Sequence, residues 1–136
     1  MVARINGAAW TATCITSASY SNGILALGAT DGKQNIGLSV SYVGLGEYTM
    51  TPLDPLNPPK TLMLASGLVN LVPASAASWV ASSATPNSSG TLTLSVFSSS
   101  GSITVGGAFT FTAEAVPGTG AGGEKIVQNG GFNITF

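Results

Sequence analysis

Apolar residues alternate with glycine, serine or threonine along most of this chain. Every second residue between 36 and 42 is apolar, and the same two-residue period recurs at 91–96, 109–112 and 132–136. A period of two is typical of strands with one buried and one solvated face, and no stretch sustains a helical period. The pattern therefore predicts an all-β antiparallel domain.

Turn dipeptides punctuate this pattern. Asn or Asp followed by Gly tolerates positive φ at both positions, which a two-residue hairpin turn requires. Such pairs, each flanked by residues with strand character, predict hairpins or tight turns at Asn6-Gly7, Asn22-Gly23, Asp31-Gly32 and Asn129-Gly130. The segment 51–60 holds four prolines and predicts an extended surface loop.

The whole chain, residues 1–136, is expected to form a single domain, because its length is that of one ordinary domain. Mostly short connections predict an antiparallel β-sandwich or flattened β-barrel of about nine strands with mostly meander connections. The expected strands are Val2–Ile5, Ala8–Ser19, Ile24–Ala29, Gln34–Tyr42, Glu47–Met50, Thr61–Leu71, Ser78–Ser82, Thr91–Ser98, Ser102–Ala115 and Lys125–Phe136.

The apolar phase of these strands predicts the core. Its expected members are Ile5, Trp10, Ile36, Leu38, Val40, Leu92, Leu94, Val96, Phe109, Phe111, Phe132, Ile134 and Phe136. Cys14 shares the phase of Trp10 and Ala12, so we expect it to be a small core residue. It is the only cysteine, which excludes an internal disulfide.

The low charge content says more about the protein's surface and location than the apolar content does. Only 7% of the residues are charged and the formal net charge is −1, so the surface has little field to attract nucleic acid and little self-repulsion. We therefore expect an extracytoplasmic protein, secreted or on the cell surface. No run of 18 apolar residues predicts a transmembrane segment. Met1 leads directly into an expected strand, so we expect either a mature form that begins with an added Met or export by another route.

Catalytic residue sets are hard to assemble from this composition. The chain has no histidine, the usual general base and the commonest zinc ligand. Glu114 and Glu124 flank one expected hairpin, but solvated charges at a strand edge explain them better than a glycosidase pair. Asp31, Glu47 and Asp54 lack the spacing of a calcium loop. We expect no enzyme activity, no catalytic residues, no cofactor and no metal.

The aromatic residues are the remaining candidates for binding. Trp10, Tyr20 and Tyr42 lie on apolar strand faces and are expected in the core, whereas Trp79 lies in an Ala- and Ser-rich segment. Trp79 is thus the aromatic expected to meet a partner. The terminal strand is the expected donor for strand addition, which adds Phe132, Ile134 and Phe136 to the candidate partner-binding residues.

Three segments resemble a known family. Residues 3–12 (ARINGAAWTA), 106–113 (GGAFTFTA) and 127–136 (VQNGGFNITF) are similar, in order and spacing, to motifs of uncharacterised all-β domains. These domains occur in lipoproteins and secreted proteins of Bacteroidota and related bacteria. The resemblance covers nearly the whole chain and implies an extracytoplasmic all-β domain. It implies no activity, and the lipoprotein cysteine usual in the family is missing here.

These observations lead to one main hypothesis and one alternative. The main hypothesis is a non-catalytic surface or structural module that binds protein, including itself, as a homo-oligomer or filament. The alternative is a small-ligand domain with a lipocalin-like cavity for a lipid or a sugar. Neither hypothesis involves nucleic acid.

Overall fold

The computed structural model describes residues 1–56, 63–72 and 77–136, and these residues form an all-β antiparallel fold without a helix. This confirms the predicted fold class. The eleven strands are β1 Val2–Ile5, β2 Ala8–Thr11, β3 Cys14–Ser21, β4 Ile24–Thr30, β5 Gln34–Ser41, β6 Gly46–Thr49, β7 Ala65–Leu71, β8 Ser78–Ser82, β9 Ser89–Ser98, β10 Thr104–Ala115 and β11 Glu124–Thr135. No helix among the described residues has the length and hydropathy to span a membrane.

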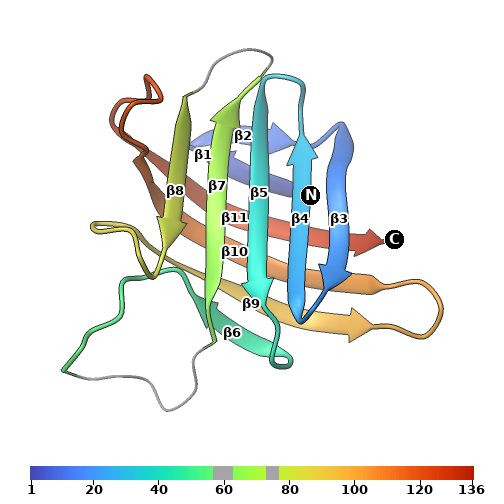
Figure 1. Cartoon of the computed structure of the whole chain (residues 1–136). Helices are drawn as coiled ribbons and strands as arrows, with labels where there is room; N and C mark the ends of the chain where they lie inside the picture. Colours follow the sequence, from blue (N-terminus) through green and yellow to red (C-terminus); the bar gives the residue numbers. More distant parts are fainter. Residues whose placement is uncertain (57–62, 73–76) are drawn as a thin grey trace.

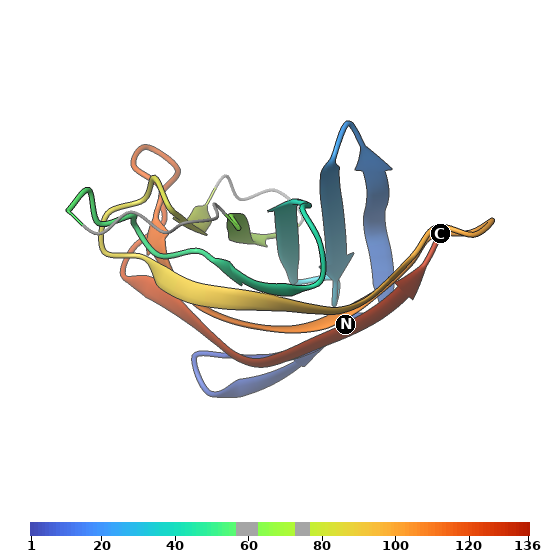
Figure 2. The ribbon, with the colours of Figure 1, turned by 90° about the horizontal axis from the view of Figure 1, so that it is seen from below.

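The strands form two layers of one curled sheet (Figure 1). The front layer has the order β8-β7-β5-β4-β3, and the rear layer has the order β6-β9-β10-β11-β1-β2. The layers join where β10 extends beyond β9 and pairs with β8. Figure 2 shows the resulting half-barrel, in which the rear layer curves beneath the front strands.

Three of the four predicted turns are confirmed. Asn6-Gly7 and Asn22-Gly23 both have positive φ and close two-residue hairpins, and Gly32 has φ +89° in the turn after Asp31. The prediction for Asn129-Gly130 is wrong, because these residues lie inside β11. Asn129 has φ +51° there, at a bulge where the β10–β11 register shifts, and the bare backbone of Gly130 lies against the ring of Phe109.

The predicted core is confirmed with one clear exception. Its largest fully buried side chains include Tyr48, Phe111 and Leu25, and the predicted members other than Val96 and Phe136 are all buried. Val96 is 44% exposed because the register shifts between Gly106 and Gly107, which turns Val96 outward. The next residue, Phe97, packs against the core instead, and Phe136 packs at its margin.

The predicted strand Ala8–Ser19 is in fact two strands in different layers. β2 lies in the rear layer and β3 in the front layer, and Ala12 and Thr13 connect them. Ala12 N donates to Met1 O at 3.0 Å, whereas Thr13 N donates to Thr30 O at 2.7 Å, so the hydrogen-bonding partner changes between adjacent residues. The crossing also reverses the predicted burial of Cys14, which is exposed.

The segment before β7 is only partly described. The strand predicted at Thr61–Leu71 begins within residues outside the described part of the chain, and β7 begins at Ala65. The proline-rich stretch is described as far as residue 56 and contains no strand there.

Candidate functional site

The half-barrel leaves strand edges without a neighbouring strand. Among the described residues, β2 pairs only with β1, β6 pairs along its length only with β9, and β3 pairs only with β4. β2 and β6 have four residues each, and Thr49 at the end of β6 also bridges to Leu64. β3 has eight residues and is the longest of these three edges. None of its residues is charged and none is proline, so it lacks the side chains that commonly block pairing at an edge.

The hairpin at Asn22-Gly23 fixes which backbone groups of β3 are unpaired. Ser21 faces Ile24 across the turn, so these two residues exchange hydrogen bonds, and every second pair beyond them does the same. Ala18 and Tyr20 occupy the intervening positions, opposite Leu27 and Leu25. Their N–H and C=O groups consequently point away from β4, toward the free side.

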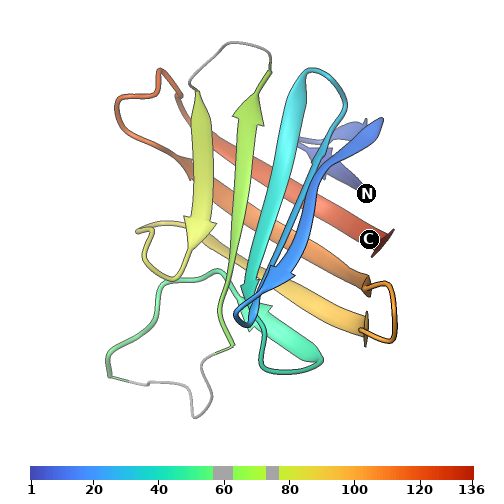
Figure 3. The ribbon, with the colours of Figure 1, turned by 45° about the vertical axis from the view of Figure 1, so that its right-hand side comes forward.

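The two faces of β3 differ in chemistry. Ser17, Ser19 and Ser21 are exposed on the outer face. The inner face carries Ile15, Ala18 and Tyr20, opposite Ala29, Leu27 and Leu25. Ile15 is 42% exposed although it faces inward. Figure 3 shows β3 at the front of the molecule, with the rear layer behind it.

An aromatic cluster of Tyr20, Tyr42 and Phe97 connects β3 to the rear layer. The ring of Tyr42 stacks on Phe97 with centroids 4.2 Å apart, and Tyr20 meets Phe97 edge-on at 5.1 Å and Tyr42 edge-on at 5.8 Å. Burial and the neighbouring Tyr48 and Tyr20 raise the pKa of Tyr42. The cluster thus packs β3 against β9 of the rear layer on the side of the half-barrel where β3 lies, which we call the open side.

Trp79, which was expected to be exposed, lies on the side of the half-barrel where β8 pairs with β10, which we call the closed side. That expectation is wrong, since Trp79 is 5% exposed on the inner side of β8. Trp79 Nε1 donates to Gly122 O at 3.2 Å, and Lys125 Nζ lies 4.6 Å from the ring centroid. The loop before β11 therefore covers the indole ring and holds it in the seam between β8 and β10.

The terminal strand β11 is an edge over only part of its length. It pairs with β10 on one side and with β1 on the other from Val127 to Gly131, so its backbone has no free side for strand addition over those residues. Phe132 and Ile134 are 7% and 6% exposed and face the core, and Phe136 exchanges backbone hydrogen bonds with Ile103 at 2.8 and 2.9 Å. The β1–β2 hairpin occupies the position beside Val127–Gly131, whereas Phe132 to Phe136 lie beyond it, so the expectation that β11 is the donor strand stays a prediction.

The carboxylates remain dispersed. Glu114 and Glu124 do face each other across β10 and β11, as their places beside one hairpin suggested, and Asn87 Nδ2 donates to Glu114 Oε1 at 3.4 Å. Asp31 Oδ1 accepts from the N–H groups of Lys33 and Gln34, which hold its pKa below the ordinary value against the opposing effect of burial. In the described part of the chain, no three His, Cys, Asp or Glu side chains gather as a possible metal site.

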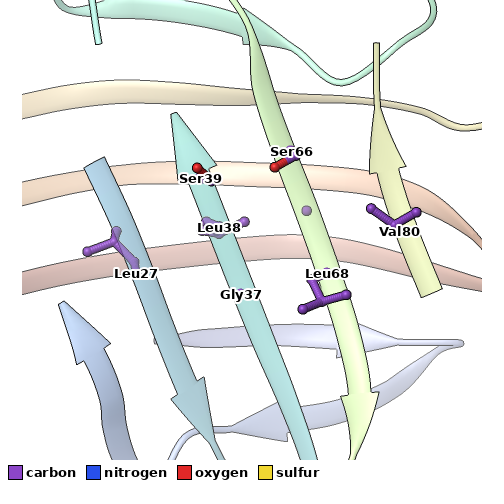
Figure 4. A pocket seen from close by; sticks show the side chains of 8 residues that line it. Leu27, Gly37, Leu38, Ser39, Ser66, Leu68 and Val80 are labelled. Atoms are coloured by element: carbon purple, nitrogen blue, oxygen red, sulfur yellow. The ribbon is translucent and has the colours of Figure 1, made fainter. Parts of the chain in front are cut away.

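The grooves of the described surface are shallow and formed by the sheet itself. One of about 290 Å³ lies where Gly37 leaves a dip beside Leu68 and Val80, with Ser39 and Ser66 at its end (Figure 4). Another of about 370 Å³ lies along the seam, beside Val80, Pro86 and Glu114. The space between the layers is filled, since Tyr48, Met50 and Phe111 are almost fully buried there.

Sequence reasoning missed the two features that define the open side, the β3 edge and Phe97. The Asn22-Gly23 turn correctly predicted that β3 pairs with β4, but the other neighbour of β3 depends on where the chain changes layer. Comparisons with protein-family models, with curated proteins and with solved structures find nothing that matches this chain, so the resemblance to the Bacteroidota domains stays a prediction.

Proposed function

We propose that this protein is a non-catalytic extracytoplasmic module that binds protein by accepting an additional strand at the β3 edge. The observation that carries the proposal is the backbone of β3, an uncharged strand of eight residues that no strand of the described residues pairs on one side. The low charge of the whole surface supports the extracytoplasmic part. In strand addition, backbone hydrogen bonds supply affinity and side chains on alternate positions supply specificity.

The bulge in β3 limits the length of a strand that can bind. The β3–β4 register shifts between Ile15 and Ser17, which leaves Thr16 as the extra residue. Beyond it, Ser17–Ser21 pairs regularly with β4 up to the hairpin turn. An added strand therefore finds a regular edge of five residues, with outward backbone groups at Ala18 and Tyr20.

The small-ligand alternative has less structural support than the protein-binding proposal. A lipocalin-like site needs an interior volume, and large side chains occupy the interior between these layers. Tyr48 is fully buried and its hydroxyl donates to Gly44 O at 2.6 Å, so its ring cannot stack on a sugar. We therefore prefer the protein-binding proposal.

A synthetic strand tests this proposal directly. A fluorescent peptide with the sequence of residues 15–21 should bind the wild-type protein, with binding followed by anisotropy. Ala18→Pro removes an outward N–H without breaking a β3–β4 hydrogen bond, so it should weaken binding at least tenfold. Ala9→Pro is the matched control, because Ala9 has the equivalent outward N–H on the shorter edge strand β2.

Thermal unfolding would establish that both proline variants are folded before binding is compared. Equal binding by the wild type and both variants would place the peptide elsewhere and overturn the proposal. Absence of binding to the wild-type protein at the highest soluble concentration would overturn it as well.

A further inference from the structure

We propose that the strand accepted at the β3 edge is β3 of a second copy of this chain, paired antiparallel about a twofold axis at Ser19. This inference rests on the proposed function and specifies its partner and register. It makes the protein a symmetric dimer in which the front layers of two copies form one continuous sheet.

The sequence of the regular edge is self-complementary. In an antiparallel pair centred on Ser19, Ser17 faces Ser21 of the other copy, Ala18 faces Tyr20, and Ser19 faces Ser19. The outer face then brings only exposed hydroxyl side chains together. The inner face places the small Ala18 against the large Tyr20, which avoids a clash between two tyrosines.

The same register satisfies the free backbone groups. Ala18 and Tyr20 are the residues of Ser17–Ser21 whose N–H and C=O groups point away from β4, and this pairing sets Ala18 of each copy opposite Tyr20 of the other. Each such pair exchanges two hydrogen bonds. A register shifted by one residue would instead oppose outward groups to groups already bonded to β4.

Structural boundaries restrict the register further. The bulge at Thr16 ends the regular pairing on one side, and the Asn22-Gly23 turn ends it on the other. Shifting by two residues in either direction would lose part of this five-residue overlap. The register centred on Ser19 is the one that uses Ser17–Ser21 of both copies in full.

Electrostatics and exposure both permit the approach of a second copy. β3 contains no charged residue, and the net charge of −1 gives two copies little reason to repel each other. Figure 2 shows the β3–β4 hairpin standing away from the curved rear layer, which leaves β3 as its outer strand.

Disulfide trapping tests the register. With Cys14 changed to Ser, Ser19→Cys would place two thiols across the twofold axis. Residues facing each other there have Cα atoms about 4.5 Å apart, which is within the range for a disulfide. Mild oxidation at a concentration where light scattering detects dimer should convert most of this variant to a covalent dimer on a non-reducing gel.

Ser17→Cys in the same background is the matched control. The two Ser17 positions would be four residues apart along the paired strands, on the order of 13 Å, which is too far for a disulfide. The double variant Ser17→Cys/Ser21→Cys should cross-link again, because Ser17 faces Ser21. All three changes replace exposed serines, so the fold should be retained.

The outcomes separate this inference from the proposed function. If Ser19→Cys cross-links no more than Ser17→Cys while the peptide still binds the β3 edge, the twofold pairing is overturned and the edge still accepts a strand. If the peptide does not bind either, the proposed function fails together with the inference. Preferential cross-linking by Ser17→Cys would overturn the Ser19 register.

Discussion

The front and rear layers are joined differently on the two sides of the half-barrel. On the closed side, the front and rear layers are continuous, because Glu114 and Ala115 of β10 pair with Val80 and Trp79 of β8. On the open side, β3 reaches no rear strand, and the layers meet through the rings of Tyr20, Tyr42 and Phe97. Backbone pairing joins one side, and side-chain packing joins the other.

The difference shows where this fold leaves backbone N–H and C=O groups that another protein could pair with. Backbone groups at the seam have partners, and Val116 N adds a bond of 2.9 Å to Ser78 O. Aromatic rings on the open side supply burial but cannot satisfy a strand's N–H and C=O groups. The stability of the molecule should therefore depend more on the closed side, and its interactions with other proteins more on the open side.

The largest expected effect separates the two sides by stability. Trp79→Ala should lower the free energy of unfolding by about 3–5 kcal/mol, because it removes a large buried side chain together with its hydrogen bond to Gly122 O. Tyr20→Ala on the open side should lower it by only about 1–2 kcal/mol, since this ring is partly exposed. Urea unfolding measures both values, and a larger loss for Tyr20→Ala would contradict the comparison.

A pair of glycines tests how tightly the layers pack. Gly67 on β7 faces inward, and a Cβ there would lie 2.8 Å from the ring of Phe111. Gly67→Ala should therefore lower the free energy of unfolding by about 1–3 kcal/mol. Gly37→Ala on the neighbouring strand is the control. Its nearest contact would be an ordinary 3.5 Å from Leu68 Cβ, so its effect should stay within about 0.5 kcal/mol.

The turn between β4 and β5 gives a smaller effect that depends on pH. Asp31 Oδ1 accepts from Lys33 N at 2.8 Å and from Gln34 N at 2.7 Å, beside the end of β4 where Thr30 pairs with Cys14 of β3. Asp31→Ala should lower the free energy of unfolding by about 0.5–1.5 kcal/mol at neutral pH. Denaturant unfolding at several pH values measures the difference between the two proteins.

The direction of this pH dependence follows from the pKa of Asp31, which lies below its ordinary value of 3.8 in the folded protein. A depressed pKa stabilises the fold above the ordinary value, and that contribution is lost as pH falls through the folded pKa. The wild type and Asp31→Ala should thus converge in stability in acid. A difference that stayed constant down to about pH 2 would show that the carboxylate charge does not matter.

Local chemistry made much of the fold predictable from the sequence. Alternating apolar residues identified most strands, and Asn22-Gly23 identified a hairpin because its residues tolerate positive φ. The crossing at Ala12 and Thr13 carries no such signal, since neither residue favours a turn. It is set by distant partners, Met1 O for Ala12 and Thr30 O for Thr13, which a local pattern does not contain.

The candidate site was less predictable for the same reason. A strand is an edge because no other strand lies beside it, and that depends on the whole topology. β11 has the aromatic pattern that suggested a donor strand, yet β1 pairs with it from Val127 to Gly131. The sequence did not predict β3 as a separate strand, because one strand was expected over Ala8–Ser19. The register shift that leaves Ser95 as an extra residue likewise turned the expected core residue Val96 outward and let Phe97 pack against the core.

The smallest expected change in stability belongs to the variant with the largest expected change in association. Ser19→Lys adds a charge at an exposed position on β3, so it should alter the free energy of unfolding by no more than about 0.5 kcal/mol. Two lysines would face each other across the proposed axis, and a lysine on an edge strand opposes pairing. Light scattering over a range of concentrations should therefore find Ser19→Lys monomeric where the wild type is dimeric. Ser41→Lys places the same charge on the same layer two strands from the edge, so it should still form dimers. Equal loss of dimer in both variants would assign the effect to net charge and remove the special role of β3.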